Sequence, residues 1–235
     1  ALTDRGFRVA GSTVRMGENL ASVGDVDRDG FDDFIVGEGS YTAEGGKENP
    51  NALRVLLFGG VKPPAQEVVV NANMQVAGAE GVAFKLSSWN YHGPTVGIGD
   101  FNGDGYGDFA LGRWVSSNGT TYIVLGRERE SLATLNFENG TPKGVWPLYT
   151  PLLDDSAGAV LTAAGDVNGD GLDDLLIGSV PKYVNNMPNN FPDYYAYLVF
   201  GRTDLANHET LDSLPLAADT VTDEYVAFKR ELGRD

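Results

Sequence analysis

The sequence predicts an all-β protein built from repeated four-stranded units, and three observations support this. An aspartate-rich and glycine-rich unit of one design occurs three times, each copy runs into a short series of consecutive apolar residues, and a further β-rich run ending in glycine follows. The 31 glycines and 11 prolines fit many short strands joined by tight turns better than they fit helices.

The repeated unit begins with a polar loop and continues into an apolar strand. Its copies span Gly24–Gly37, Gly99–Gly112 and Gly165–Gly178. The apolar runs leaving the loops are 34–36, 109–111 and 175–177. Because successive side chains of a strand point to opposite faces, apolar residues at consecutive positions predict a strand buried on both faces. We therefore expect sheets that stack on one another.

Each unit supplies a strand into the loop, a strand out of it and two further strands. Four-stranded sheets that bury their faces on neighbouring sheets are typical of β-propeller blades. Since propellers close with about four to eight blades, three units predict part of a larger propeller. The expected division is an outer strand of a preceding blade over 1–10, blades over 11–76, 77–150 and 151–222, and the start of a following blade over 223–235.

The loops carry oxygen-bearing side chains at relative positions 1, 3, 5 and 9, and the backbone carbonyl at position 7 would add another oxygen. Calcium takes six to eight oxygen ligands at about 2.3–2.6 Å, and glycine at position 6 permits the sharp turn that wraps them around the ion. The sequence therefore predicts three calcium sites. The predicted ligands are Asp25, Asp27, Asp29, Phe31 and Asp33; Asp100, Asn102, Asp104, Tyr106 and Asp108; and Asp166, Asn168, Asp170, Leu172 and Asp174.

Other interpretations of the loops are weaker. Aspartate, asparagine and glycine are common in ordinary turns, but three matched copies argue against chance. An EF-hand needs a glutamate at position 12, where this chain has Val36, Leu111 and Ile177. Magnesium prefers a compact octahedral shell that keeps its waters. With four carboxylates in the first loop and three in each of the others, we expect the first site to bind calcium most tightly.

The composition excludes several functional classes. The net charge of -16 argues against binding nucleic acid or anionic membranes by charge attraction. The absence of cysteine excludes disulfides, thiolate metal sites and a cysteine nucleophile. No run approaches the ~20 apolar residues of a membrane span, and the first residues lack a signal-peptide pattern. We expect a mature, processed or excised segment of an extracellular, cell-surface or periplasmic protein that does not insert into a membrane.

Few residues are candidates for catalysis. His92 and His208 lie in different units, and no nucleophile pattern accompanies either of them. The carboxylate pairs that glycoside hydrolysis would require are already part of the aspartate loops. We therefore expect a non-enzymatic protein with no catalytic residues.

The aspartate loops resemble the FG-GAP repeats of integrin α-subunit β-propellers and their bacterial relatives, over essentially the whole chain. Phe58-Gly59 and Phe200-Gly201 match the "FG" half, and the second unit has Leu125-Gly126. The "GAP" half departs from the pattern, for example at Gly37-Glu38-Gly39. The resemblance implies a seven-bladed propeller with structural calcium between the first and second strands of each blade. It also implies ligand binding on the opposite face.

The expected function is a calcium-stabilised binding and adhesion scaffold at the cell surface or outside the cell. The long connections over 38–51 and 179–194 would bind protein or carbohydrate on the face opposite the loops. The remaining blades would come from the same parent chain or from a partner chain. Two alternatives stay open, namely the propeller portion of a secreted hydrolase or lyase, and a structural component of a surface layer or filament.

Overall fold

The computed structural model describes residues 6–11, 16–39, 53–61, 67–71, 73–86, 91–114, 119–138, 140–149, 157–179, 195–205 and 225–229. These residues form strands and one short helix, α1 (Arg129–Leu132). Most of 38–51 and 179–194, the connections expected to bind a ligand, lies outside the described residues. No helix in the described part of the chain is long and apolar enough to cross a membrane.

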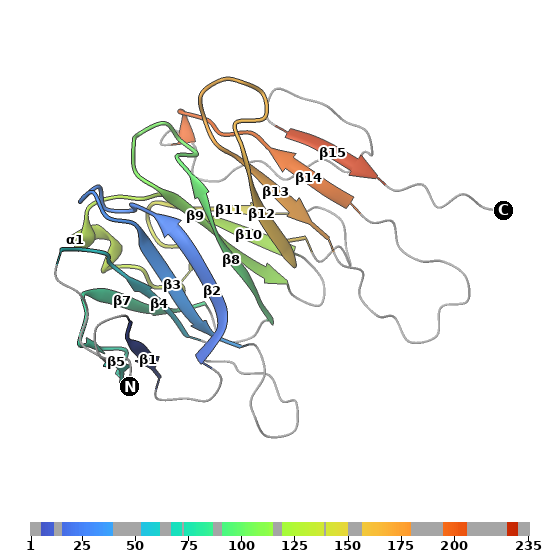
Figure 1. The fold of residues 1–235 in the computed structure, drawn as a ribbon. Coiled ribbons are helices and arrows are strands. Elements are labelled where there is room, and N and C mark those ends of the chain that lie inside the picture. The colour runs from blue at the N-terminus through green and yellow to red at the C-terminus, as the bar shows by residue number, and fades with distance from the viewer. Residues whose placement is uncertain are drawn as a thin grey trace, which may run out of the picture.

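Three four-stranded antiparallel sheets dominate the fold (Figure 1). The first contains β2 (Met16–Gly24), β3 (Asp33–Glu38), β4 (Leu53–Leu57) and β7 (Gly81–Lys85). The second contains β8 (Tyr91–Gly99), β9 (Asp108–Trp114), β10 (Gly119–Val124) and β11 (Val145–Tyr149). The third contains β12 (Val160–Gly165), β13 (Asp174–Gly178), β14 (Tyr195–Val199) and β15 (Tyr225–Lys229). The predicted all-β fold with three four-stranded blades is confirmed.

A fourth, smaller sheet packs beside the first blade. In it β1 (Arg8–Ala10) pairs in parallel with β5 (Glu67–Val70), which pairs with β6 (Val76–Ala77). The partner of β1 thus comes from the connection between β4 and β7. Residues 1–10 were expected to belong to a preceding blade, but in this structure β1 is joined to a segment inserted into the first blade.

The strand pairing also differs from the expected blade boundaries. Gly81–Lys85, expected in the second blade, pairs with β4 and closes the first. Tyr225–Lys229, expected to open a following blade, pairs with β14 and closes the third. A strand that closes one blade and a strand that opens the next look alike in sequence. Only the long-range hydrogen-bond register separates them.

The blades bury both faces of their central strands, as the consecutive apolar residues predict. In β3, Ile35 packs into the core between the first and second blades, while Val36 packs toward the small sheet. In β9, Phe109 and Leu111 face the first blade, and Ala110 faces the third. Alternation along a strand therefore sends neighbouring side chains into two different cores.

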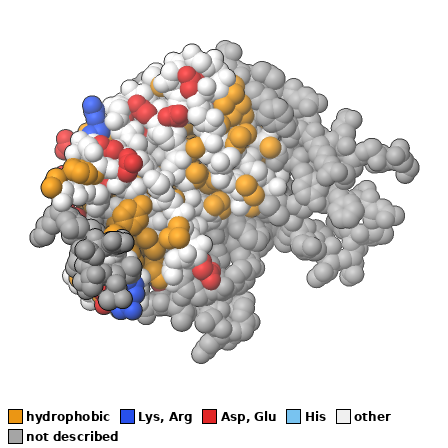
Figure 2. All heavy atoms as spheres, in the orientation of Figure 1, with side chains coloured by type: hydrophobic (Ala, Val, Ile, Leu, Met, Phe, Trp, Pro, Cys, Tyr) orange, Lys and Arg blue, Asp and Glu red, His pale blue; other side chains and the backbone are white. Residues whose placement is uncertain are grey.

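The first strands of the blades lie side by side, with β8 packed between β2 and β12. Each of these strands enters its polar loop at the same end of the molecule, so the three loops form a row along one edge (Figure 1). Figure 2 shows acidic side chains gathered along this edge. The packing of the inner strands thus concentrates the negative charge of three separate sequence motifs.

A buried arginine joins the first two blades at the opposite end. Arg54 is 1% exposed. Its guanidinium donates to the carbonyl oxygens of Glu38 (2.9 Å) and Gly93 (3.1 Å) and to the hydroxyl of Thr95 (3.3 Å). Burial lowers the pKa of Arg54 to about 10, and the Glu38 carboxylate opposes that shift. The side chain therefore stays charged at neutral pH and holds β8 against the first blade.

Candidate metal centres

The three loops share one backbone conformation. At position 6, Gly30, Gly105 and Gly171 have φ angles of 92°, 83° and 92°. This left-handed region is costly for residues that carry a Cβ. The glycines that the sequence pattern placed at the sharp turn are therefore required there by the backbone.

Each loop folds around the aspartate at position 1. In the first loop, Asp25 accepts hydrogen bonds from the backbone N–H groups of Asp29 (3.0 Å) and Gly30 (2.8 Å), and Asp29 accepts one from Phe31 (2.9 Å). The other two loops repeat this pattern with Asp100 and Asp104, and with Asp166 and Asp170. The residues at position 7 are thus held beside the carboxylate of position 5 in all three loops.

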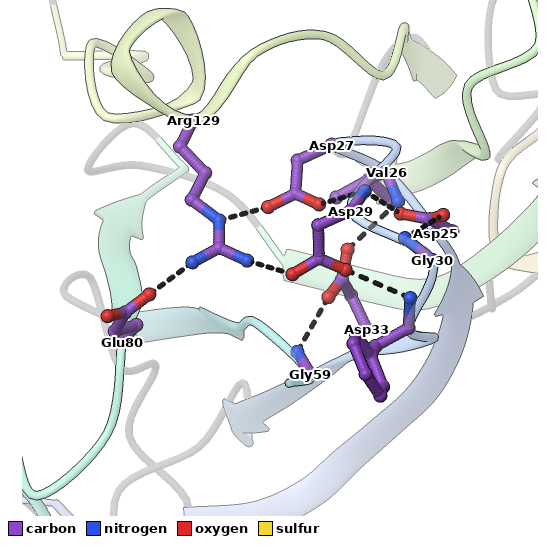
Figure 3. Close-up of polar contacts among 10 residues, drawn as sticks. Asp25, Val26, Asp27, Asp29, Gly30, Asp33, Gly59, Glu80 and Arg129 are labelled. Carbon is purple, nitrogen blue, oxygen red and sulfur yellow. Dashed lines mark hydrogen bonds and ion pairs between the residues drawn. The ribbon is translucent and has the colours of Figure 1, made fainter. Parts of the chain in front are cut away.

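The first loop brings three carboxylates together. Asp25, Asp27 and Asp29 each offer an oxygen, and these oxygens lie within 4.8 Å of one another (Figure 3). In the other loops position 3 is an asparagine, and its amide nitrogen donates to Asp104 and Asp170 at 2.8 Å in both cases. All the side chains offered are hard oxygen donors. This chemistry fits calcium or another divalent cation that prefers oxygen ligands.

The aspartate at position 9 has a different environment from the others. Asp33, Asp108 and Asp174 are at most 1% exposed, and in each residue both carboxylate oxygens accept backbone hydrogen bonds. The donors are Val26 and Gly59, Phe101 and Gly126, and Val167 and Gly201, at 2.7–2.9 Å. These carboxylates therefore fasten the start of each loop to the glycine after the third strand. Sequence reasoning assigned them only to the metal.

Burial also changes the acidity of two of these groups. Removal from water raises the pKa of Asp33 to about 6 and that of Asp108 to about 8. The backbone hydrogen bonds act in the opposite direction, and the neighbouring loop aspartates act in the same direction as burial. Burial and the neighbouring carboxylates thus both oppose loss of the proton from Asp33 and Asp108.

Adjacent loops are hydrogen-bonded to each other across the blades. The carbonyls of Asp25 and Val26 accept from the N–H groups of Gly107 and Arg127, both at 2.8 Å. The carbonyls of Asp100 and Phe101 accept from Asp173 (3.3 Å) and Arg202 (2.9 Å) in the same way. Sequence reasoning missed these joints, although the matched Gly126-Arg127 and Gly201-Arg202 pairs were a signal for them. Each loop is thereby part of the contact between two blades.

Comparison with known proteins agrees with this geometry. Residues 17–56 match the FG-GAP repeat family, and they cover the first loop, β3 and nearly all of β2 and β4. The chain is also 27% identical to "Integrin alpha-PS2" of Drosophila melanogaster over 222 residues, which are 88% of this chain and 14% of the integrin. The chain thus matches the FG-GAP repeat over 17–56 and is similar over most of its length to an integrin α-subunit. Its four-stranded sheets are β-propeller blades, and it spans about one seventh of the relative's length.

The glycine of each "FG" pair has a steric role in this fold. A Cβ on Gly59, Gly126 or Gly201 would lie only 2.3–2.6 Å from the carbonyl oxygen at loop position 8. These glycines let the end of the third strand approach the loop closely enough to donate to the position 9 carboxylate. The phenylalanine is less restricted, since Leu125 replaces it in the second blade and is also buried.

Proposed function

We propose that the three loops each bind a calcium ion and that these ions stabilise the propeller as a scaffold for adhesion outside the cell or at its surface. The observation that carries the proposal is the repetition of one oxygen-lined loop at successive blades. The proposed ligands are the side chains at positions 1, 3, 5 and 9 and the carbonyl oxygen at position 7. An ordinary turn needs no such set of carboxylates, whereas calcium requires one.

Electrostatics supports a bound cation. Carboxylates a few ångströms apart repel one another, most strongly where they are withdrawn from water. Asp25, Asp27 and Asp29 bring oxygens within 4.8 Å of one another, and Asp33 is buried beside them. A divalent cation would convert this repulsion into attraction.

The proposed scaffold role rests on the arrangement of the two ends of the blades. The outgoing strands begin at the loops and end at Glu38 and Gly178, so the connections that follow them start at the opposite end. We assign recognition of a protein or carbohydrate ligand to that end, where irregular connections can vary without disturbing the metal loops. The similarity to an integrin α-subunit supports an adhesion role and an extracellular location.

The calcium proposal predicts a stoichiometry. Protein freed of metal by a chelator and titrated with calcium in a calorimeter should bind three ions per chain, and magnesium should bind more weakly because it keeps its waters. The double substitution of Asp100 and Asp104 by asparagine should reduce the number of bound calcium ions to two. Binding of one ion or none to the unaltered chain, or equal binding of magnesium, would contradict the proposal.

The scaffold proposal predicts calcium-dependent recognition. Labelled protein applied to arrays of extracellular matrix proteins and glycans should bind at least one of them when calcium is present. The binding signal should disappear when a chelator is added. Substitutions within 179–194 should abolish binding while three calcium ions still bind. Turnover of a glycan on the array, rather than its retention, would instead favour the hydrolase or lyase alternative.

A further inference from the structure

The first loop differs from the others by the presence of a cation from the next blade. Arg129, at the start of α1 in the second blade, donates to Asp27 through Nε and to Asp29 and Glu80 through its terminal nitrogens (Figure 3). Its guanidinium also lies over the ring of Phe58, 4.7 Å from the centroid. Two predicted metal ligands are therefore in direct contact with a fixed positive charge.

The contact between the second and third blades shows the opposite arrangement. Arg129 stands three residues after the FG glycine Gly126, and the corresponding residue after Gly201 is Asp204. Asp204 pairs with Arg202 of its own blade. Position 3 is aspartate in the loop that faces Arg129 and asparagine in the loop that precedes the Asp204 blade. The extra carboxylate of the first loop thus occurs together with a guanidinium that contacts it. The cation beside the second loop, Arg28, donates instead to the backbone carbonyl of Asp104 (3.1 Å).

We propose that Arg129 is a built-in counter-ion that competes with calcium at the first loop and lowers its calcium affinity. The inference rests on the proposed calcium function and concerns how that site is tuned. Arg129 offsets the charge of one of the four predicted ligand carboxylates of the first loop, whereas each of the other loops has three such carboxylates. The expectation that the first site is the tightest therefore no longer follows from its carboxylate count.

Arg129 and calcium compete because both would use the carboxylate oxygens of Asp27. One oxygen of Asp27 accepts from the backbone N–H of Asp29 (3.2 Å), and the other accepts from Arg129. The Asp27 side chain is only 2% exposed, compared with 30% for that of Arg129. The guanidinium consequently covers Asp27. Calcium must bind beside a positive charge or draw Asp27 and Asp29 away from it, and either route opposes binding.

A reporter at position 7 isolates the first loop. Phe31 is partly exposed, at 38%, so F31W should place a tryptophan beside the first site alone. Terbium bound there would emit by energy transfer from Trp, and calcium competition would then measure the affinity of that loop. Calorimetric titration of the same chain measures the other two loops together.

In the F31W chain we expect R129Q to tighten calcium binding at the first loop by about tenfold, since removing one adjacent unit charge strengthens attraction by roughly that factor at a partly exposed site. The calorimetric signal of the other two loops should not change. R8Q, which removes the same charge from the exposed pair of Arg8 with Glu67, serves as the matched control and should leave both signals unaltered.

The outcomes separate this inference from the calcium proposal. If the F31W chain binds neither ion at the first loop, the proposed function fails there. If it binds and R129Q leaves the affinity unchanged or weakens it, Arg129 orients the ligands instead of competing, and the inference is wrong. R129K keeps the charge and should stay close to the parent affinity. If R129K raised the calcium affinity of the first loop as much as R129Q does, a charge-based explanation would also be overturned.

Discussion

Removing calcium should lower the melting temperature of this protein by about 20 °C. A ligand present at 100 times its Kd stabilises the folded state by about 2.7 kcal/mol, so three such sites contribute about 8 kcal/mol. For a domain of 150–250 residues each kcal/mol corresponds to roughly 2–4 °C. Thermal melts recorded by far-ultraviolet circular dichroism, one in millimolar calcium and one in excess EGTA, measure this difference.

The size of this effect depends on where the loops lie. The carbonyls of Asp25 and Asp100 bond to the loop of the next blade, so loosening one loop loosens the joint between two sheets. Magnesium at the same concentration should restore much less of the lost stability. Coincident melts in calcium and EGTA would show that the loops are stable turns without metal, and the structural role of calcium would then be rejected.

Replacing Asp108 with alanine should destabilise the protein by about 2–5 kcal/mol even when calcium is absent. The side chain is fully buried and accepts hydrogen bonds from Phe101 and Gly126 at 2.8 Å each. D108A leaves two buried N–H donors without an acceptor, at about 1–3 kcal/mol each. Urea denaturation in EGTA measures this loss without any contribution from the metal.

Asp104 provides the matched control in the same loop. It is also an aspartate and a predicted ligand, but it is exposed. D104A should therefore cost about 0.5 kcal/mol or less in EGTA and should mainly reduce the stabilisation gained on adding calcium. If D108A does not fold, D108N retains one acceptor oxygen and should show a smaller loss. Equal losses for D104A and D108A in EGTA would contradict the structural role of position 9.

Local features of the sequence were enough to predict the loops and the strands next to them. The spacing of Asp25, Asp27, Asp29 and Gly30 defines a turn through contacts between residues at most five apart. Side chains in a strand alternate between its two faces, so the consecutive apolar residues of β3 and β9 predicted blades buried on both sides. These predictions hold because the interactions responsible are close in sequence or follow from backbone periodicity.

Long-range contacts decided the rest. Whether Gly81–Lys85 closes the first blade or opens the second depends on its pairing with β4, and no local pattern expresses that choice. The structural role of Asp33 depends on Gly59, 26 residues away, and the cation facing Asp27 comes from Arg129, 102 residues away. The sequence alone determined that three oxygen-lined loops exist. Only the tertiary structure decided which neighbour each carboxylate meets, because stacking the blades brings distant residues together and sets their charge balance.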